Sequence, residues 1–300
     1  GGLSSDNYDI TFVEGELEIT KAALIITANN ISKVYDGVAY SGGNGVTYSG
    51  FVGSDDAGDL CGGLTFTGSS QGAVNVGKYV ITPGGLSSDN YDITFVEGEL
   101  EITKAALIIT ANNISKVYDG VAYSGGNGVT YSGFVGSDDA GDLCGGLTFT
   151  GSSQGAVNVG KYVITPGGLS SDNYDITFVV GGLEITPRVI QVTADDLSKV
   201  YGDSDPALTY QITQGNLVAG DGFTGALVRV PGEDVGTYAI QQGTLALSGN
   251  YILTFVPGKL QITQAELPKT GVNEYKYYIL GLMAMLLGTI FSAKSKKLTN

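Results

Sequence analysis

The sequence contains no histidine and no tryptophan among its 300 residues. Without imidazole, the most frequent general base of enzymes and the usual nitrogen ligand of zinc are both missing. Basic residues are also scarce: 15 lysines and arginines stand against 30 acidic residues, which gives a formal charge of −15. Because an acidic chain repels nucleic acid, we expect no nucleic-acid partner. The composition points away from an enzyme, and we expect no cofactor.

Cysteine is limited to Cys61 and Cys144. The two residues occupy the same place in two copies of an internal repeat, so neither copy contains a pair. A disulfide needs two Cα atoms within about 7 Å, and equivalent positions in neighbouring domains are normally a domain length apart. We therefore expect no disulfide framework, and no neighbouring imidazole is available to activate a thiolate.

Internal repetition divides the chain. Lys21 recurs as Lys104, a period of 83 residues, and the ranges 21–103 and 104–186 differ at only two positions. The range 187–263 is a diverged third copy. Residues 1–20 repeat residues 84–103 unchanged, so we interpret them as the C-terminal remnant of an upstream repeat in a longer exported protein. Alone they cannot bury a core, and we expect them to be disordered or loosely docked.

Short alternating apolar runs predict an all-β chain. In the first repeat these runs are Ala23–Ala28, Val46–Ser49, Leu64–Thr67, Lys78–Thr82, Tyr91–Phe95 and Glu99–Thr103. Turn-forming clusters such as Gly84–Asn90 separate them. Six or seven short strands in about 80 residues favour tandem immunoglobulin-like β-sandwiches. The alternative is a β-grasp-like sheet with one short helix near Gly50–Gly62. Each repeat runs into the next without a flexible linker, which predicts a stiff rod.

Several polar residues are candidates for a site. Asp55, Asp56 and Asp59 share one loop and are weak candidates for Ca²⁺ ligands, although a solvated acidic turn explains them better. Lys33, Tyr35 and Asp36 are candidates for a binding motif. We favour the alternative, in which Tyr35 is a core aromatic and Asp36 and Gly37 form a turn. An isopeptide bond from Lys33 or Lys78 to an asparagine is a further alternative, and it requires a buried pair beside a carboxylate.

The C-terminal part has three elements in a fixed order. A linker over residues 264–276 contains Leu267, Pro268, Lys269, Thr270 and Gly271. An apolar run follows over residues 277–293, and its length of about 17 residues is just enough for a transmembrane helix. The basic tail 294–300 contains Lys294, Lys296 and Lys297, which predicts a cytoplasmic end.

This end of the chain resembles the LPxTG sorting signal of Gram-positive surface proteins. The resemblance implies that the transpeptidase sortase cuts between Thr270 and Gly271 and joins the Thr270 carboxyl group to an amine of a peptidoglycan precursor. The helix and the retention lysines would hold the precursor in the membrane until then, and the product would be extracellular and attached to the cell wall. The alternative is an ordinary C-terminal membrane anchor.

The repeats carry a second resemblance. Residues 21–103 and 104–186, with Lys33-Val34-Tyr35-Asp36-Gly37, resemble the YDG repeats of bacterial surface proteins. Residues 187–263, with Lys199-Val200-Tyr201-Gly202-Asp203, are similar to MBG repeats of the YGX type. These likenesses imply a structural or adhesive role and bring no catalytic residues. We expect a stalk that projects an upstream region. The alternative is that the repeats themselves bind host glycan, mucin or matrix protein.

Overall fold

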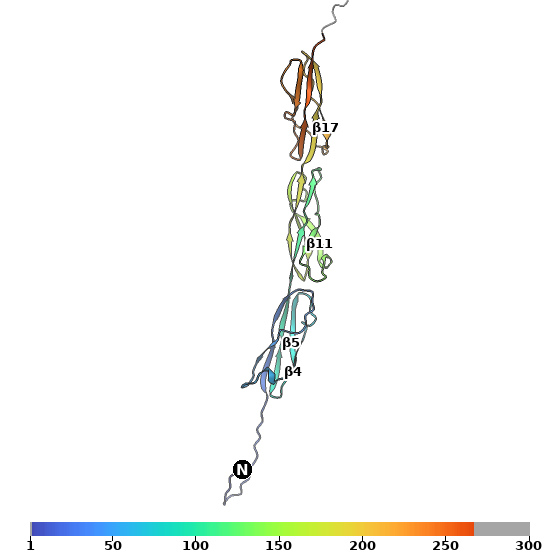
Figure 1. Cartoon of the computed structure of the whole chain (residues 1–300). Helices are drawn as coiled ribbons and strands as arrows, with labels where there is room; N and C mark the ends of the chain where they lie inside the picture. The colour runs from blue at the N-terminus through green and yellow to red at the C-terminus, as the bar shows by residue number, and fades with distance from the viewer. Residues whose placement is uncertain (1, 267–300) are drawn as a thin grey trace, which may run out of the picture. The chain divides into compact units, whose positions relative to one another are not determined.

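The computed structural model describes residues 2–266, which are almost entirely β-strand and loop (Figure 1). These residues divide into two compact units. Unit 1 contains residues 2–117 and 121–186, and unit 2 contains residues 118–120 and 187–266. The predicted all-β class is confirmed. The predicted transmembrane helix over 277–293 lies outside the described residues.

The first repeat forms a three-stranded and a four-stranded sheet, in the orders β3-β1-β6 and β2-β7-β5-β4. Its strands are β1 (Ala22–Ala28), β2 (Ile31–Val34), β3 (Val46–Ser49), β4 (Cys61–Thr67), β5 (Gly77–Ser87), β6 (Tyr91–Val96) and β7 (Gly98–Thr103), with one 3-10 turn, η1 (Ala57–Asp59). Two pairings are parallel, β1 with β6 and β2 with β7, and the others are antiparallel.

The core lies between the two sheets because apolar side chains alternate along the strands. On β1, Leu24 and Ile26 are fully buried beside Tyr91. On β7, Leu100 and Ile102 belong to a second buried cluster, which also includes Ala28 of β1. Glu101, between Leu100 and Ile102, is exposed. Two sheets that pack on each other through buried apolar side chains fit the predicted sandwich. The β-grasp-like alternative placed a short helix near Gly50–Gly62, and that region contains only the single turn η1.

The second repeat has the same two sheets, in the orders β10-β8-β13 and β11-β12-β14-β9. Its elements are β8 (Ala105–Ala111), β9 (Ile114–Val117), β10 (Val129–Ser132), η2 (Ala140–Asp142), β11 (Cys144–Thr150), β12 (Gly160–Ser170), β13 (Tyr174–Val179) and β14 (Gly181–Thr186). Only Lys104 separates β7 from β8, so the last strand of repeat one leads directly into repeat two.

The third repeat, in unit 2, keeps this plan with the sheet orders β17-β15-β20 and β16-β21-β19-β18. Its strands are β15 (Arg188–Ala194), β16 (Leu197–Val200), β17 (Tyr210–Gln214), β18 (Val228–Arg229), β19 (Gly236–Gln241), β20 (Tyr251–Val256) and β21 (Gly258–Thr263).

The strand prediction omitted β2 and was wrong about one turn. The cluster Gly84–Asn90 was expected to be a turn, but β5 continues through Ser87. It does so because its partner β4 carries a register shift between Gly62 and Thr65. Gly62 and Gly85 both adopt positive φ angles, 91° and 83°, which only glycine takes without strain. The glycines therefore kink a paired strand instead of ending it.

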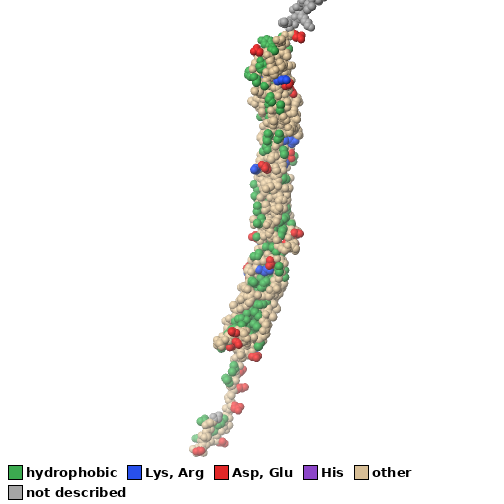
Figure 2. All heavy atoms as spheres, viewed as in Figure 1, with side chains coloured by type: hydrophobic (Ala, Val, Ile, Leu, Met, Phe, Trp, Pro, Cys, Tyr) green, Lys and Arg blue, Asp and Glu red, His purple; other side chains and the backbone are tan. Residues whose placement is uncertain are grey.

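Residues 2–20 contain no strand, and their side chains are exposed. Figure 2 shows acidic side chains along this segment. On the face drawn there, charged side chains are scattered over the repeats instead of forming one patch.

Candidate functional site

The residues predicted to form the sorting signal, Leu267 to Gly271, lie outside the described residues, as do the retention lysines. Over residues 2–266 we find no helix with the length and apolar character needed to cross a membrane. The structure therefore bears on the repeats, where the most elaborate polar arrangements lie at their ends.

The acidic loop of repeat one uses its carboxylates within the protein. Asp56 is the N-cap of η1, accepting from the Gly58 amide at 2.7 Å, and its own amide donates to Asp59 at 2.9 Å. Asp55 accepts a hydrogen bond from the Tyr91 hydroxyl at 2.7 Å. Among residues 2–266, no three acidic or cysteine side chains gather as a metal site would require. The loop therefore caps a turn and binds a tyrosine.

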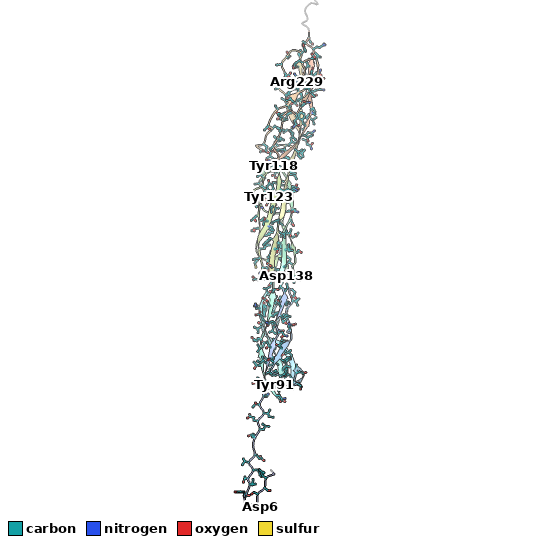
Figure 3. The ribbon with its side chains drawn as sticks, turned by 90° about the vertical axis from the view of Figure 1, so that its left-hand side faces the viewer. Asp6, Tyr91, Tyr118, Tyr123, Asp138 and Arg229 are labelled. Atoms are coloured by element: carbon teal, nitrogen blue, oxygen red, sulfur yellow. The ribbon has the colours of Figure 1, made fainter. Side chains whose placement is uncertain are left out.

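The equivalent aspartate of repeat two, Asp138, binds two tyrosines. Its Oδ2 accepts from the Tyr174 hydroxyl at 2.7 Å, within the repeat, and from the Tyr35 hydroxyl of repeat one at 2.9 Å. The two rings meet edge to face, with centroids 5.5 Å apart at an interplanar angle of 80°. We call Tyr35, Asp138 and Tyr174 the first tyrosine clasp. Figure 3 shows Asp138 where the two repeats of unit 1 meet.

Tyr35 reaches this position because of the strand that precedes it. It follows β2, and its amide donates to the carbonyl of Thr103, the last residue of β7, at 2.8 Å. Its side chain is only 7% exposed, so the prediction of a buried aromatic is confirmed. Gly37 in the following turn has a φ of 71°, and a Cβ placed on it would lie 3.6 Å from Val135. The Tyr-Asp-Gly turn thus packs onto repeat two.

An amide pair and a shared core complete the junction. Asn173 accepts from the Val76 amide at 3.0 Å and donates to Asn75 Oδ1 at 3.0 Å. One buried cluster also runs from repeat one into repeat two, and it includes Tyr35, Ile102, Ala105, Leu107 and Tyr174. The two repeats of unit 1 are therefore joined by continuous packing as well as by the chain.

Unit 2 contains a second tyrosine clasp, made by Tyr118, Asp221 and Tyr251. Asp221 Oδ2 accepts from Tyr118 at 3.0 Å and from Tyr251 at 2.6 Å, and the rings lie edge to face at 5.4 Å. Val218 donates its amide to Tyr251 at 2.9 Å, as Val135 does to Tyr174. The same geometry recurs although the surrounding residues differ, so the clasp is a shared structural feature of these repeats.

The clasps keep their tyrosines protonated. Burial, followed by donation to Asp138, raises the pKa of Tyr174 to about 12, and the same causes raise the pKa of Tyr35. Burial and donation to Asp221 likewise raise the pKa values of Tyr118 and Tyr251. A phenol that stays neutral is a donor to a carboxylate over the whole physiological pH range. This chemistry suits a structural contact and supplies no general base.

Repeat three contains a different polar cluster. Lys199, the one buried lysine of the described residues, donates to Asp205 at 2.7 Å and to Glu233 at 2.6 Å. Arg229 binds the same two carboxylates and lies over the Tyr238 ring. Hydrogen bonds from Arg229 and Lys199 lower the pKa of Asp205 to about 2. The cluster is therefore an ion-pair network that ties two loops together.

The ionised carboxylate of Asp205 opposes an isopeptide bond between Lys199 and Asp205. Amide formation needs a neutral amine and a carboxyl group that can lose its hydroxyl, but Arg229 keeps Asp205 ionised and the pKa of Lys199 is raised by its hydrogen bonds to Asp205 and Glu233. Lys33 binds the Val38 carbonyl and Asp36, and exposed Lys78 binds Glu99. In the described part of the chain, neither of those two lysines is bonded to an asparagine side chain.

The sequence contains a signal for the clasp in the spacing of its aspartates. Asp55, Asp138 and Asp221 recur at the 83-residue spacing, whereas Asp56 and Asp59 have no counterpart in repeat three. The aspartate that is present in all three repeats is the one that accepts a hydrogen bond from tyrosine. Its partner could not be inferred because Tyr35 and Asp138 are 103 residues apart in the chain. Cys61 and Cys144 are exposed free thiols.

Comparisons with known proteins agree with the repeat pattern. The family model described as MBG domain (YGX type) matches residues 24–101, 107–184 and 190–261. It thus covers the first two repeats as well, for which we noted a likeness to YDG repeats. A second model, the LPXTG cell wall anchor motif, matches residues 261–297. None of the curated proteins compared with the chain matches it.

Among solved structures, the chain is similar to Drosophila N-cadherin EC1-4 and to the I9-I11 tandem of titin. The cadherin match has 10% identity, covers 82% of this chain and 76% of that one, and has a TM-score of 0.24. The titin match has 9% identity, covers 81% of this chain and all of that one, and has a TM-score of 0.21.

Proposed function

The chain belongs to the MBG domain (YGX type) family and carries an LPXTG cell wall anchor motif, and from this premise we propose that its repeats form a stiff stalk on the bacterial surface. It is a sortase-anchored, extracellular protein of the Gram-positive cell wall. Its domains are those of a structural surface protein and not of an enzyme family.

The junction inside unit 1 is the observation that carries the stalk proposal. One residue, Lys104, separates β7 from β8, and the first tyrosine clasp, the Asn75–Asn173 pair and a shared core bridge the two repeats. A flexible tether would need none of these contacts. Copies that dock through the same residues lengthen the array without new contacts, which explains why two repeats can be almost identical.

The strand pairing also suits a chain under tension. The chain enters repeat one at β1 and leaves at β7, and both belong to parallel pairs: β1 with β6 and β2 with β7. Force applied at the two ends therefore slides the parallel strands along each other. The backbone hydrogen bonds across each pair must then break together, whereas a hairpin pulled at its open end loses them one at a time. A wall-anchored stalk benefits from such resistance.

A measurement of junction stiffness tests the stalk. Cys61 and Cys144 are the only cysteines, are exposed and lie at equivalent places in the two repeats of unit 1, so both can carry spin labels without mutation. We expect one narrow distance distribution by pulsed electron resonance. Tyr35→Ala should broaden it, while Tyr201→Ala, at an exposed equivalent position, should not. A broad distribution in the unchanged protein would refute the stalk.

For anchoring we propose that Leu267 to Gly271 are the residues that sortase reads, with Thr270 as the residue joined to the peptidoglycan precursor and Lys294, Lys296 and Lys297 as the retention tail. Expression in a sortase-positive host should place the protein in the wall fraction, cut after Thr270. Thr270→Ala should leave full-length protein in the membrane, and Lys269→Ala, at the variable motif position, should behave as the unchanged chain. Wall attachment of Thr270→Ala would overturn this assignment.

A groove in repeat two favours a second candidate function, binding of host glycan or protein. Its cavity of about 410 Å³ is lined by polar and aromatic side chains, among them Asn113, Lys161, Tyr162 and Glu184. Gly182 forms part of the cavity lining. The equivalent position in repeat one is Glu99, which forms an ion pair with Lys78. If the repeats are an adhesin, Tyr162→Ala should abolish binding to a glycan or matrix array and Tyr79→Ala, the repeat-one equivalent, should not. No binding by the unchanged chain would refute the adhesin.

A further inference from the structure

The end of repeat one opposite the first tyrosine clasp has the residues of a clasp but not its second tyrosine. We define the socket of repeat one as Val52, Asp55, Asn90 and Tyr91; the sockets of repeats two and three are Val135, Asp138, Asn173 and Tyr174, and Val218, Asp221, Asn250 and Tyr251. Figure 3 shows Tyr91 at this end of repeat one. Within the described residues, Asp55 accepts from one tyrosine, whereas Asp138 and Asp221 each accept from two.

The socket of repeat one is preformed. Tyr91 is 4% exposed, donates to Asp55 at 2.7 Å and accepts from the Val52 amide at 2.9 Å, which reproduces the contacts of Tyr174 in repeat two. The Val52 amide favours the ionised phenol, but donation to Asp55 and burial outweigh it, and the pKa of Tyr91 is raised. No rearrangement is needed before a second phenol can donate to Asp55.

The socket residues of repeat one are more exposed than their equivalents in the two clasps. Val52, Asp55 and Asn90 are exposed, while their equivalents in both other sockets are half-buried. Val52 alone is 59% exposed. A cavity of about 260 Å³ lies here, lined by all four socket residues together with the chain segment from Ile19 to Ala22. Its walls combine an apolar side chain, an amide and a carboxylate, the chemistry that holds Tyr35 in the first clasp.

From this geometry we infer that the socket of repeat one is a docking site for the Tyr-Asp-Gly turn of one further repeat. The inference rests on the proposed stalk, since it treats the repeats as units that join end to end. The tyrosine hydroxyl would donate to Asp55, its ring would meet Tyr91 edge to face, and the glycine would lie on Val52. Asn90 would take the role of Asn173 and receive a backbone amide of the docked repeat.

The segment that leads into the socket agrees with this occupant. Gly15–Thr20 has the same sequence as β7, which pairs in parallel with β2 and so delivers Tyr35 to its socket. A strand like β2 laid along Gly15–Thr20 in the same register would place its following tyrosine amide against the Thr20 carbonyl, as Tyr35 lies against Thr103. A repeat that ends in this segment is therefore the partner that the site fits.

A second copy of this chain fits less well. Its clasp tyrosines Tyr35 and Tyr118 are engaged, which leaves Tyr201, 54% exposed, on a turn with Asp203 at the position of Gly37 and Gly120. At Gly120, a Cβ would meet Val218 Cγ1 at 2.5 Å. A side chain at that position would collide with the valine of the socket, so the Tyr-Gly-Asp turn of repeat three is a poor substitute.

The experiment adds a copy of residues 21–83 before Gly1, so that the added residues and residues 1–20 together have the sequence of residues 21–103. With Cys144→Ser, spin labels report the distance between the added cysteine and Cys61. We expect a narrow distribution. Asp55→Ala should raise the undocked population by roughly 10- to 100-fold, the range for a hydrogen bond to a charged acceptor, and so broaden it. Asp92→Ala, an exposed acid on the adjacent strand β6, is the control and should leave it narrow.

The outcomes separate this inference from the stalk proposal. In the original chain with both cysteines, Asp138→Ala tests the occupied junction. If Asp138→Ala broadens that distribution but Asp55→Ala has no effect in the extended chain, the docking site is wrong and the stalk stands. If neither variant has an effect, the aspartates do not hold the junctions and the docking inference fails, whereas a broad distribution in the unchanged original chain would refute the stalk itself. Sedimentation of the original chain should show a monomer, and a dimer abolished by Asp55→Ala would identify a second copy as the occupant and overturn the inference.

Discussion

Replacing Tyr35 by phenylalanine removes one hydroxyl from the first tyrosine clasp and leaves the ring. That hydroxyl donates to Asp138 at 2.9 Å. A hydrogen bond to a charged group contributes about 1.5–3 kcal/mol. Because Asp138 is half-buried and keeps its bond from Tyr174, the loss should fall at the lower end of this range, about 1.5 kcal/mol. Tyr35→Ala also removes a ring that is 7% exposed, and should cost about 3–4 kcal/mol.

The assay is urea unfolding of the whole chain, followed by circular dichroism and compared at equal protein concentration. The chain supplies its own control in Tyr201, the third copy of the same tyrosine, which is 54% exposed and lies outside both clasps. Tyr201→Phe should change stability by less than about 0.5 kcal/mol. A second comparison is Tyr118→Phe, which removes the matching hydroxyl from Asp221 and should resemble Tyr35→Phe.

One result would refute the reasoning. If Tyr35→Phe and Tyr201→Phe unfold at the same urea concentration while Tyr35→Ala unfolds earlier, the hydroxyl bond to Asp138 contributes nothing. The junction would then depend on ring packing, the Asn75–Asn173 pair and the shared core, and the recurrence of an aspartate at this position would need another explanation.

Four further predictions concern tyrosine ionisation, the ion pairs of Asp205 and the two thiols. In an ultraviolet titration, the clasp tyrosines should ionise at higher pH than ordinary tyrosines. The stability that the Tyr174 proton contributes should be intact below pH 10 and lost as pH rises through about 12. Ionisation of all the clasp tyrosines near pH 10 in the folded protein would contradict this. Arg229→Gln should destabilise unit 2, but by less than the loss of a fully buried ion pair would, because Asp205 is partly exposed. Since the folded-state pKa of Asp205 is depressed to about 2, its contribution should be present above about pH 4 and disappear as pH falls through 2, and calorimetry at both pH values would show it. Cys61 and Cys144 should both react with a maleimide in the native protein, and mass spectrometry showing fewer than two adducts would count against free, exposed thiols.

The local patterns of the sequence determined the class of fold. Alternation along Ala23–Ala28 places Leu24 and Ile26 inward by strand geometry alone, and the run of Glu99–Thr103 does the same for Leu100 and Ile102. The period of 83 residues fixed the number of repeats, and the order of pentapeptide, apolar run and lysines indicated the anchor. All these signals act over a few residues or by simple recurrence, so they can be read without coordinates.

The clasps depended on tertiary structure, because their members are far apart in the chain and each is ambiguous alone. Asp55 looked like part of an acidic loop and Tyr35 like an ordinary core aromatic. Only the direct passage of β7 into β8 and the parallel pairing of β2 with β7 bring Tyr35 onto Asp138. The ion network of Lys199 likewise joins loops that the sequence does not pair.

Residues 1–20 show the difference between what the sequence determines and what the tertiary structure determines. They are identical to residues 84–103, where β6 and β7 form, yet residues 2–20 contain no strand. Leu17 is 84% exposed and Leu100 is 0% exposed, although their local sequences are the same. The sequence determined which residues are able to form a strand and which of them are apolar. The tertiary structure decided whether they do, because the hydrogen-bond partners and the opposing core that stabilise a strand come from other parts of a repeat.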